Sequence, residues 1–309
     1  MSEPVPSSLP GRPGRRGRRA RIAAALAVLV ALVAYVVVQY VTSGRGVPQC
    51  TVGSGSRTYT LTPEQASNAA TISAVGTTRG MPERAVTIAL ATALQESALR
   101  NIRHGDRDSL GLFQQRPSQG WGTRKEILDP VVSASRFYEH LAEVPGYSRL
   151  PLTVAAQRVQ RSGYPQAYAK HEPDATLLAA ALTGRSEASL TCTAGSAPRA
   201  AGDPAKVRAE LVRSFGAGVL PRDRGAGGAE IPVPVTVAAE SAGPEGAVGS
   251  ARRGWELAQW AVAQADELGI EEVAYGDRVW SAGESDEGWR ERPAADPASG
   301  GEVRIRVAR

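Results

Sequence analysis

A run of 20 uncharged residues near the N-terminus constrains this chain more than any other feature. Residues 22–41 read IAAALAVLVALVAYVVVQYV. As a helix that rises about 1.5 Å per residue, this run would be roughly 30 Å long, which is the thickness of the hydrocarbon core of a bilayer. The sequence therefore predicts a transmembrane helix over 22–42, which separates a basic tail, 1–21, from the bulk of the chain.

A cleaved signal peptide is the alternative for this segment. The apolar core of a signal peptide usually runs only about 7–15 residues, and no Ala-x-Ala-like cleavage site follows at the usual distance. Six arginines precede the segment, and one, Arg45, follows closely. Because arginine and lysine collect on the cytoplasmic side, the pattern favours a single-pass anchor in the cell membrane with a cytoplasmic N-terminus and an extracytoplasmic bulk.

The basic tail also accounts for the charge of the chain. The net charge is +5, and the tail alone sums to that value, so the remaining residues carry equal numbers of basic and acidic groups. A nucleic-acid-binding protein would show a basic stripe on its folded part. We therefore expect no nucleic-acid partner, and the sequence gives no indication of a protein partner.

Two cysteines, Cys50 and Cys192, lie beyond the membrane segment, where an oxidising environment permits a disulfide. Such a bond would join the two ends of one domain and constrain the unfolded chain by up to about 5 kcal/mol in the loop-entropy model. Two free thiols are the alternative.

The pattern of helix signals divides the chain beyond the membrane segment. Residues 43–57 are rich in glycine and serine and predict a stalk, and helix signals then dominate 58–192. They include a capping box at 62–65 and prolines at helix starts. Between the expected helices, residues 103–123 predict a loop or a short hairpin. Helices are expected over 62–76, 82–100, from 129 onward, and over 152–161 and 173–183.

The remainder of the chain predicts a linker and a second, smaller module. Residues 193–250 are largely alanine, glycine and proline and predict a linker, with a helix at 204–215. Residues 251–309 predict an α+β module with a helix, a hairpin at Gly276-Asp277 and a final strand. Its four tryptophans could bind glycan or pack its core, and packing is favoured for at least two of them.

Glu96 is unusual because it follows a segment, 85–94, that has no charged residue and predicts a helix buried on all sides. A carboxylate at the mouth of a core is poorly solvated, which raises its pKa and suits it to act as a general acid. The alternative is a surface ion pair with Arg100 or Arg103, worth only a few tenths of a kcal/mol.

The residues around Glu96 resemble a known family. Glu96-Ser97 followed by Gly111-Leu112-Phe113-Gln114 is similar to the Glu-Ser and Gly-Leu-Met-Gln motifs of lytic transglycosylases and goose-type lysozymes, with phenylalanine in place of methionine. The runs GDRDSLGLFQQRPSQGWG and AAQRVQRSGYPQAYAKHE also resemble lysozyme-like domains of secreted and phage-associated proteins from high-GC Gram-positive bacteria. The resemblance covers about 60–190.

This resemblance implies a mainly α fold, with a lysozyme-like helical domain after one transmembrane helix and before the small α+β module. It also implies that Glu96 protonates the glycosidic oxygen between N-acetylmuramic acid and N-acetylglucosamine in peptidoglycan. The residues expected to contact the sugars, some through their backbone, are Ser97, Gly111, Phe113, Gln114, Trp121, Gln160 and Tyr164. A packing role is nearly as plausible for Trp121 and Tyr164.

A second carboxylate would decide the reaction outcome. Glycosidases that use water commonly need a base or nucleophile about 5–9.5 Å from the acid. Asp106 and Asp108 precede the Gly-Leu-Phe-Gln stretch, and Asp108 is our candidate. Turn formation or an ion pair with Arg103 or Arg107 is the alternative. Without such a carboxylate, the substrate's own hydroxyl could close an anhydro ring, which is the transglycosylase route.

The sequence departs from the family at one motif. Lytic transglycosylases usually carry an Ala-Tyr-Asn motif whose tyrosine contacts the catalytic acid. Alignment of AAQRVQRSG with it puts Val159 at the tyrosine and Gln160 at the asparagine. Tyr164 and Tyr168 are candidates to replace the missing tyrosine from nearby.

The sequence lacks the residue patterns that several other classes of functional site require. No two of the three histidines have metal-ligand spacing, and the sequence contains no Cys-x-x-Cys, phosphate-binding loop or Gly-x-Ser-x-Gly elbow. We expect no metal and no cofactor. Two hypotheses remain, namely a peptidoglycan-cleaving muramidase or lytic transglycosylase, and a non-catalytic peptidoglycan-binding or scaffold protein that retains the fold.

Overall fold

The chain divides into two compact units, 1–46 and 47–309. A computed structural model describes residues 15–42, 47–161, 165–195, 201–221, 228–235, 244–292 and 300–309.

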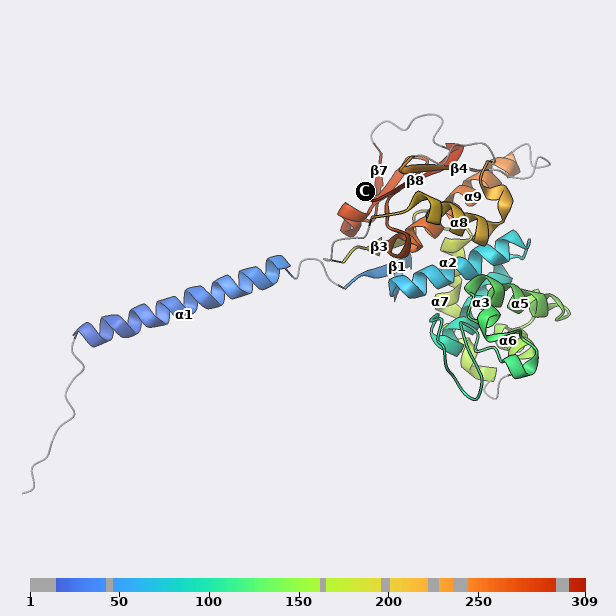
Figure 1. Cartoon of the computed structure of the whole chain (residues 1–309), viewed down its shortest axis with the longest axis horizontal. Coiled ribbons are helices and arrows are strands. Elements are labelled where there is room, and N and C mark those ends of the chain that lie inside the picture. The colour runs from blue at the N-terminus through green and yellow to red at the C-terminus, as the bar shows by residue number, and fades with distance from the viewer. Residues whose placement is uncertain are drawn as a thin grey trace, which may run out of the picture. The chain divides into compact units, whose positions relative to one another are not determined.

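The first unit contains one helix, α1, over Arg15–Thr42 (Figure 1). Within it, Ala20–Val38 has a mean hydropathy of 2.6, and none of this span is buried inside the protein. By length and composition it could cross a membrane, a property that signal sequences share. The predicted apolar helix is therefore confirmed, and its orientation in a membrane stays a prediction.

The second unit begins with a helical part built around α3 (Figure 1). All ten residues of 85–94 within α3 are buried, as their uncharged sequence predicts. Helices α2, α5, α6 and α7 contact α3 and cover its faces. The helices of this part are α2 (Pro63–Thr78), α3 (Glu83–Ser97), α4 (Arg124–Ile127), α5 (Pro130–Ala142), α6 (Leu152–Gln160) and α7 (Glu172–Leu182).

Local signals in the sequence set the ends of these helices. Thr62 caps α2, and its side chain and that of Gln65 form the predicted capping box. Pro82 precedes α3, which ends where Ala98 adopts a left-handed conformation with φ 52°. Near the end of α2, a Cβ at Gly76 would lie 2.6 Å from the Tyr138 hydroxyl, so only glycine lets α5 approach this closely.

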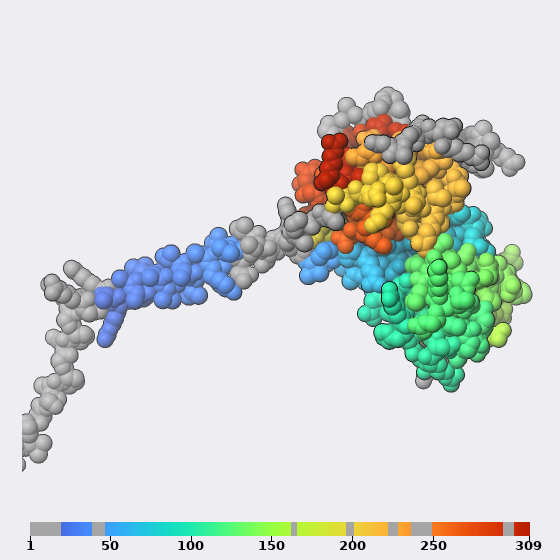
Figure 2. Space-filling model, in the orientation of Figure 1, coloured from blue at the N-terminus to red at the C-terminus, as the bar shows by residue number. Residues whose placement is uncertain are grey.

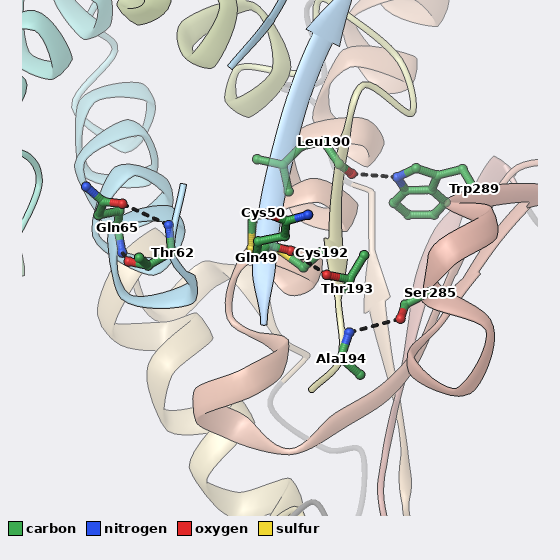
Figure 3. The surroundings of a disulfide bond; sticks show 10 residues. All are labelled: Gln49, Cys50, Thr62, Gln65, Leu190, Cys192, Thr193, Ala194, Ser285 and Trp289. Atoms are coloured by element: carbon green, nitrogen blue, oxygen red, sulfur yellow. Dashed lines mark hydrogen bonds between the residues drawn. A yellow bond between two sulfur atoms is a disulfide. The ribbon is translucent and has the colours of Figure 1, made fainter. Parts of the chain in front are cut away.

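A three-stranded antiparallel sheet joins the two ends of the helical part. Its strands are β1 (Gln49–Ser54), β2 (Arg57–Leu61) and β3 (Leu190–Thr193), in the order β2-β1-β3. Cys50 and Cys192 face each other across β1 and β3 and form the predicted disulfide (Figure 3). Because β1 begins at Gln49 and β2 at Arg57, residues 49–57 of the predicted stalk, 43–57, form a hairpin of the sheet instead.

The C-terminal part contains a five-stranded antiparallel sheet with the strand order β4-β8-β5-β6-β7. Gly276-Asp277 joins β5 to β6, as predicted, and Gly269 ends the preceding helix. The elements are α8 (Pro204–Phe215), β4 (Glu230–Pro234), α9 (Pro244–Ala263), α10 (Ala265–Leu268), β5 (Ile270–Tyr275), β6 (Arg278–Ser281), β7 (Trp289–Glu291) and β8 (Glu302–Val307).

The stretch predicted as a linker, 193–250, is largely part of the fold. It supplies the predicted helix α8, the edge strand β4 and the beginning of α9. The sequence did not predict β4 because the strand contains two prolines, which argue against a strand. The structure accommodates them because β4 lies at the edge of the sheet, where proline is tolerated. The described parts of this stretch thus contribute structure to the compact unit 47–309.

Helix α9 attaches the C-terminal part to the helical part through buried polar side chains. Gln259, which is fully buried, donates to the carbonyls of Ala181 and Ser186 and accepts from the backbone N–H groups of Ser189 and Leu190. Gln264 bonds Ser67 of α2 in the same way. In the space-filling view, the orange C-terminal residues lie directly against the blue residues of α2 (Figure 2).

The tryptophans of the C-terminal part pack its interior. Trp255, Trp260 and Trp280 are at most 5% exposed, which supports packing over glycan binding. Trp289 contacts Trp255 edge to face, and its indole N–H donates to the Leu190 carbonyl (Figure 3). These aromatic contacts further tie the five-stranded sheet to β3.

We expect the disulfide to stabilise the folded protein, so its loss should measurably lower the free energy of unfolding. Substitution of both Cys50 and Cys192 by alanine should lower the free energy of unfolding by about 3–5 kcal/mol, because the bond closes a loop with a sequence separation of 142 residues. Urea unfolding followed by tryptophan fluorescence measures this change. Reductant should lower the midpoint of the wild-type protein and leave that of the double variant unchanged. An unchanged wild-type midpoint after complete reduction would contradict the expectation.

Candidate functional site

Glu96 lies at the last turn of α3, where the buried helix emerges from the core. Its side chain is half-buried, and the Tyr168 hydroxyl donates to Glu96 Oε1 at 2.6 Å. Tyr168 is fully buried and comes from the 3-10 helix η3, Pro165–His171. The sequence named Tyr168 as a replacement for the motif tyrosine, and the structure puts it in contact with the carboxyl group.

Burial raises the pKa of the Glu96 carboxyl group, and hydrogen bonds from Tyr168 and Gln160 oppose this rise. Burial is the larger effect, so the pKa stays above its ordinary value. Gln160 also donates from Nε2 to the Phe113 carbonyl at 2.7 Å, which fixes its amide beside the acid. A raised pKa and a fixed orientation are the properties that suit a carboxyl group to act as a general acid.

Glu96 faces a cavity of about 780 Å³. This volume is within the range of sites that hold small molecules or a few sugar units. The lining side chains are mostly polar and come from the loop after α3, the end of α5 and the end of α6. They are Glu96, Asp106, Arg107, Ser109, Gln114, Arg116, Gln119, Trp121, His140, Glu143, Val144, Pro145, Arg158, Val159, Gln160 and Arg161.

Three of the predicted sugar contacts build the wall of the cavity instead. The Ser97 hydroxyl is buried and donates to the Leu112 carbonyl at 2.8 Å, which ties the loop to the end of α3. Gly111 has φ 73°, and a Cβ there would lie 2.6 Å from a backbone oxygen of α4. The Phe113 ring is fully buried and stacks on Phe137 with the ring centroids 4.6 Å apart.

Gln114 lines the cavity, as predicted for a sugar-binding residue. It has a positive φ of 48°, and its amide donates to the Gly111 carbonyl at 3.2 Å. A Cβ at Gly105 would lie 1.8 Å from Gln114 Oε1, so glycine at that position makes room for the amide. The next residue, Gln115, is buried and holds the loop to α5 by donating to the Ser133 carbonyl.

Trp121 and Gln160 also line the cavity, whereas Tyr164 falls outside the described residues. The Trp121 ring is partly buried and lies against His140, with the ring centroids 4.3 Å apart. Trp121 therefore has a packing partner on one side and borders the cavity on another. A sugar ring could stack on an indole held in this way.

Asp108, the predicted second catalytic carboxylate, is not itself among the residues that line the cavity. Arg116 donates to Asp108 Oδ1 at 2.7 Å, and the Ser118 backbone N–H donates to Oδ2 at 2.9 Å. These contacts hold the pKa of the Asp108 carboxyl well below its usual range, so it forms a stable ion pair within the loop. Asp106 does line the cavity, but its side chain is 94% exposed to solvent.

Left-handed backbone conformations gather around this cavity. Among the described residues, non-glycine residues with a positive φ are Ala98, Leu99, Arg107, Gln114, Arg161 and Ala188. The first two directly follow α3, and the next three line the cavity. Each such residue costs of order 1 kcal/mol or more and persists only where the surroundings enforce it, often at functional sites.

Sequence reasoning missed several residues that shape the site. His171 contacts the Gln95 side chain at 3.1 Å and so fixes η3 against α3. The arginines of the cavity, including Arg158 and Arg161, had no motif to mark them. Their only signal was position, because both lie within two residues of Gln160. Among the described residues, no three His, Cys, Asp or Glu side chains form a group that could hold a metal ion.

Substitution of Tyr168 by phenylalanine tests the contact with Glu96. The variant loses a hydrogen bond that favours the carboxylate, so the pKa of Glu96 should rise further above its ordinary value. A ¹³C-NMR titration of glutamate-labelled protein measures this pKa, and the spectrum of Glu96→Gln assigns the signal. Tyr147→Phe, which removes a hydroxyl outside the cavity lining, should leave the titration unchanged. A lower pKa in Tyr168→Phe would contradict the geometry.

A comparison with protein families finds one match, confined to the C-terminal part. A family model described as "VldE, C-terminal domain" matches residues 240–299. The described portion of this match runs from α9 to β7. None of the curated proteins matches the chain. The family match covers well under half of the sequence and includes none of the residues that line the cavity.

Proposed function

We propose that this protein cleaves the glycan strands of peptidoglycan outside the cell membrane, with Glu96 as the general acid. The observation that carries the proposal is the half-buried Glu96 carboxyl group, which faces a polar cavity and accepts a hydrogen bond from Tyr168. The raised pKa of this group suits proton donation to a glycosidic oxygen. The surface ion pair considered for Glu96 is not among the interactions of the described residues.

The resemblance to lysozyme-like domains gains support from Tyr168 and Gln160. In the family, a tyrosine of the Ala-Tyr-Asn motif contacts the catalytic acid. Here Val159 occupies the tyrosine position and is buried at the edge of the cavity, while Tyr168 from η3 makes the contact. Gln160, at the asparagine position, bonds both Glu96 and the Phe113 carbonyl. We infer that Tyr168 takes the place of the motif tyrosine from a different position, whereas Gln160 acts from the asparagine position itself.

We favour the transglycosylase route over hydrolysis. Glu96 donates its proton to the glycosidic oxygen, and the bond between this oxygen and C1 of N-acetylmuramic acid breaks. The C6 hydroxyl oxygen of the same sugar then bonds C1, and its proton returns to the Glu96 carboxylate. No water is consumed. The ion pair of Asp108 with Arg116 supports this route, as does the high exposure of the other lining acids, 94% for Asp106 and 78% for Glu143. Among the described residues, none of these carboxylates is partly buried and oriented by hydrogen bonds at the cavity as Glu96 is.

A non-catalytic peptidoglycan-binding or scaffold protein is the second candidate. The observation that favours it is that, among the described residues, no second carboxylate is partly buried and oriented at the cavity. Gln114 and Trp121 could hold a glycan strand without cleaving it. The two candidates differ in one measurable property, which is whether glycan bonds break.

Substitution Glu96→Gln distinguishes these candidates. Glutamine keeps the size of the side chain but cannot donate the proton, so muropeptide release should fall by about 10²–10⁴-fold. Release from purified peptidoglycan by the full-length protein in detergent is measured by chromatography. Glu187→Gln, at an exposed position outside the cavity lining, should retain full activity. Full activity in Glu96→Gln, or none in the wild-type protein, would reject catalysis by this acid.

The proposed location is a single-pass anchor, α1, with a cytoplasmic N-terminus and residues 47–309 outside the membrane. Support comes from the length and composition of Ala20–Val38, from the arginines before it, and from a disulfide, which forms in oxidising compartments.

Protease added outside intact spheroplasts should therefore remove 47–309 and leave a fragment of the N-terminal tail and α1 in the membrane. Mass spectrometry of the undigested membrane protein should find the tail still attached. Protection of 47–309 from the protease would reverse the orientation, and a mature chain that lacks the tail would indicate a cleaved signal peptide.

A further inference from the structure

The side chains of two arginines of the cavity lining, Arg158 and Arg161, make no hydrogen bond or ion pair among the described residues. Arg158 lies in the last turn of α6, and Arg161 directly follows this helix. Both side chains are exposed and line the cavity. Exposed arginines on protein surfaces are common, so the argument depends on their neighbours.

The other arginines of the lining are already engaged. Arg116 forms the 2.7 Å ion pair with Asp108, and Arg107 lies 4.0 Å from Asp106. The remaining acid of the lining besides Glu96 is Glu143, which lies 3.8 Å from His140. Arg158 and Arg161 are therefore the arginines of the cavity lining whose side chains have no acidic partner among the described residues.

The position of the pair ties it to the reacting centre. Gln160, between the two arginines in sequence, bonds Glu96 and the Phe113 carbonyl. Residues 158–161 span about one helical turn, or roughly 5 Å along the axis. Arg161 has φ 51°, a conformation that costs an arginine free energy and that here accompanies a side chain in the cavity lining.

We propose that Arg158 and Arg161 form a subsite for a carboxylate on the peptide carried by the substrate glycan. This inference rests on the proposed function, because peptidoglycan supplies the peptide. The lactyl ether that bears this peptide is attached to the same sugar ring whose C1–oxygen bond breaks, so a site beside the acid lies within its reach. Guanidinium groups bind carboxylates with paired, charge-assisted hydrogen bonds, which suits two adjacent arginines.

The subsite predicts that the charge of the peptide determines substrate affinity. The experiment compares three substrates. The first is peptidoglycan with free peptide carboxylates, and the second is the same material after chemical amidation of those carboxylates. The third consists of glycan strands from which an amidase has removed the peptides, so that only the lactyl carboxylate remains. The full-length protein in detergent should show a KM about 10-fold lower for the first substrate than for the other two, with a similar kcat. The preference should shrink at high salt.

The double variant Arg158→Gln/Arg161→Gln should lose this preference by raising KM for the free-carboxylate substrate alone. Arg57→Gln/Arg149→Gln, which removes two exposed arginines outside the cavity lining, is the matched control and should behave as the wild-type protein. Equal KM values on all three substrates, or equal effects of both double variants, would overturn the proposal. Arginine dependence on stripped strands would also overturn it, since the lactyl group would then be the bound carboxylate.

A binding measurement separates this proposal from the proposed function. In a Glu96→Gln background, sedimentation with the free-carboxylate substrate should still weaken by about 10-fold in the arginine double variant. This result together with no cleavage by the wild-type protein would support the subsite and reject catalysis. Cleavage without any arginine-dependent binding would reject the subsite and leave the catalytic role of Glu96 intact.

Discussion

The burial of α3 on every side is the constraint on which the second unit depends. A helix with no charged residue over 85–94 cannot face water, so α2, α5, α6 and α7 surround it. The last turn of α3 emerges from the core and carries Glu96. The carboxyl group is partly buried because the helix that carries it is buried up to this turn. The raised pKa of Glu96 thus follows from the packing of the helix. Hydrogen bonds from Tyr168 and Gln160 limit the rise of the pKa and orient the carboxyl group.

The C-terminal part belongs to the same structural unit as the helix that carries Glu96. Helix α9 contacts α2, α7 and β3, and the buried Gln259 satisfies backbone groups at the end of α7 and the start of β3. Buried amides that satisfy several partners at once are costly to break, because each lost bond leaves a desolvated polar group. The disulfide holds β3 against β1 beside this junction. The family match of residues 240–299 therefore lies in a part of the chain that supports the helical part as well as its own sheet.

Local sequence signals predicted the helices and the hairpin. The features that could not be predicted depend on contacts between residues that are distant in the sequence. The signals that begin or end helices act within one helical turn, so they can be recognised in the sequence alone. They include the capping box at Thr62, the proline at 82 and the glycine at 269. The ion pair of Asp108 with Arg116 was not predicted, because the chain folds back across the loop to form it, and the catalytic role of Asp108 stays a prediction. Ser97 and Phe113 belong to the resemblance, but a motif does not tell whether a side chain contacts substrate or supports the wall. The lysozyme-like fold itself stays a prediction.

Mass spectrometry of the material that the wild-type protein releases from peptidoglycan tests the central claim most directly. Glu96 is the acid, and in the part of the chain that the structure describes no second carboxylate is oriented as a nucleophile. The muropeptides should therefore end in anhydro-muramic acid, which is one water lighter than a reducing end. Reducing ends would contradict the transglycosylase route and require a second catalytic carboxylate. Intact strands after prolonged incubation with folded, disulfide-bonded protein would contradict catalysis altogether.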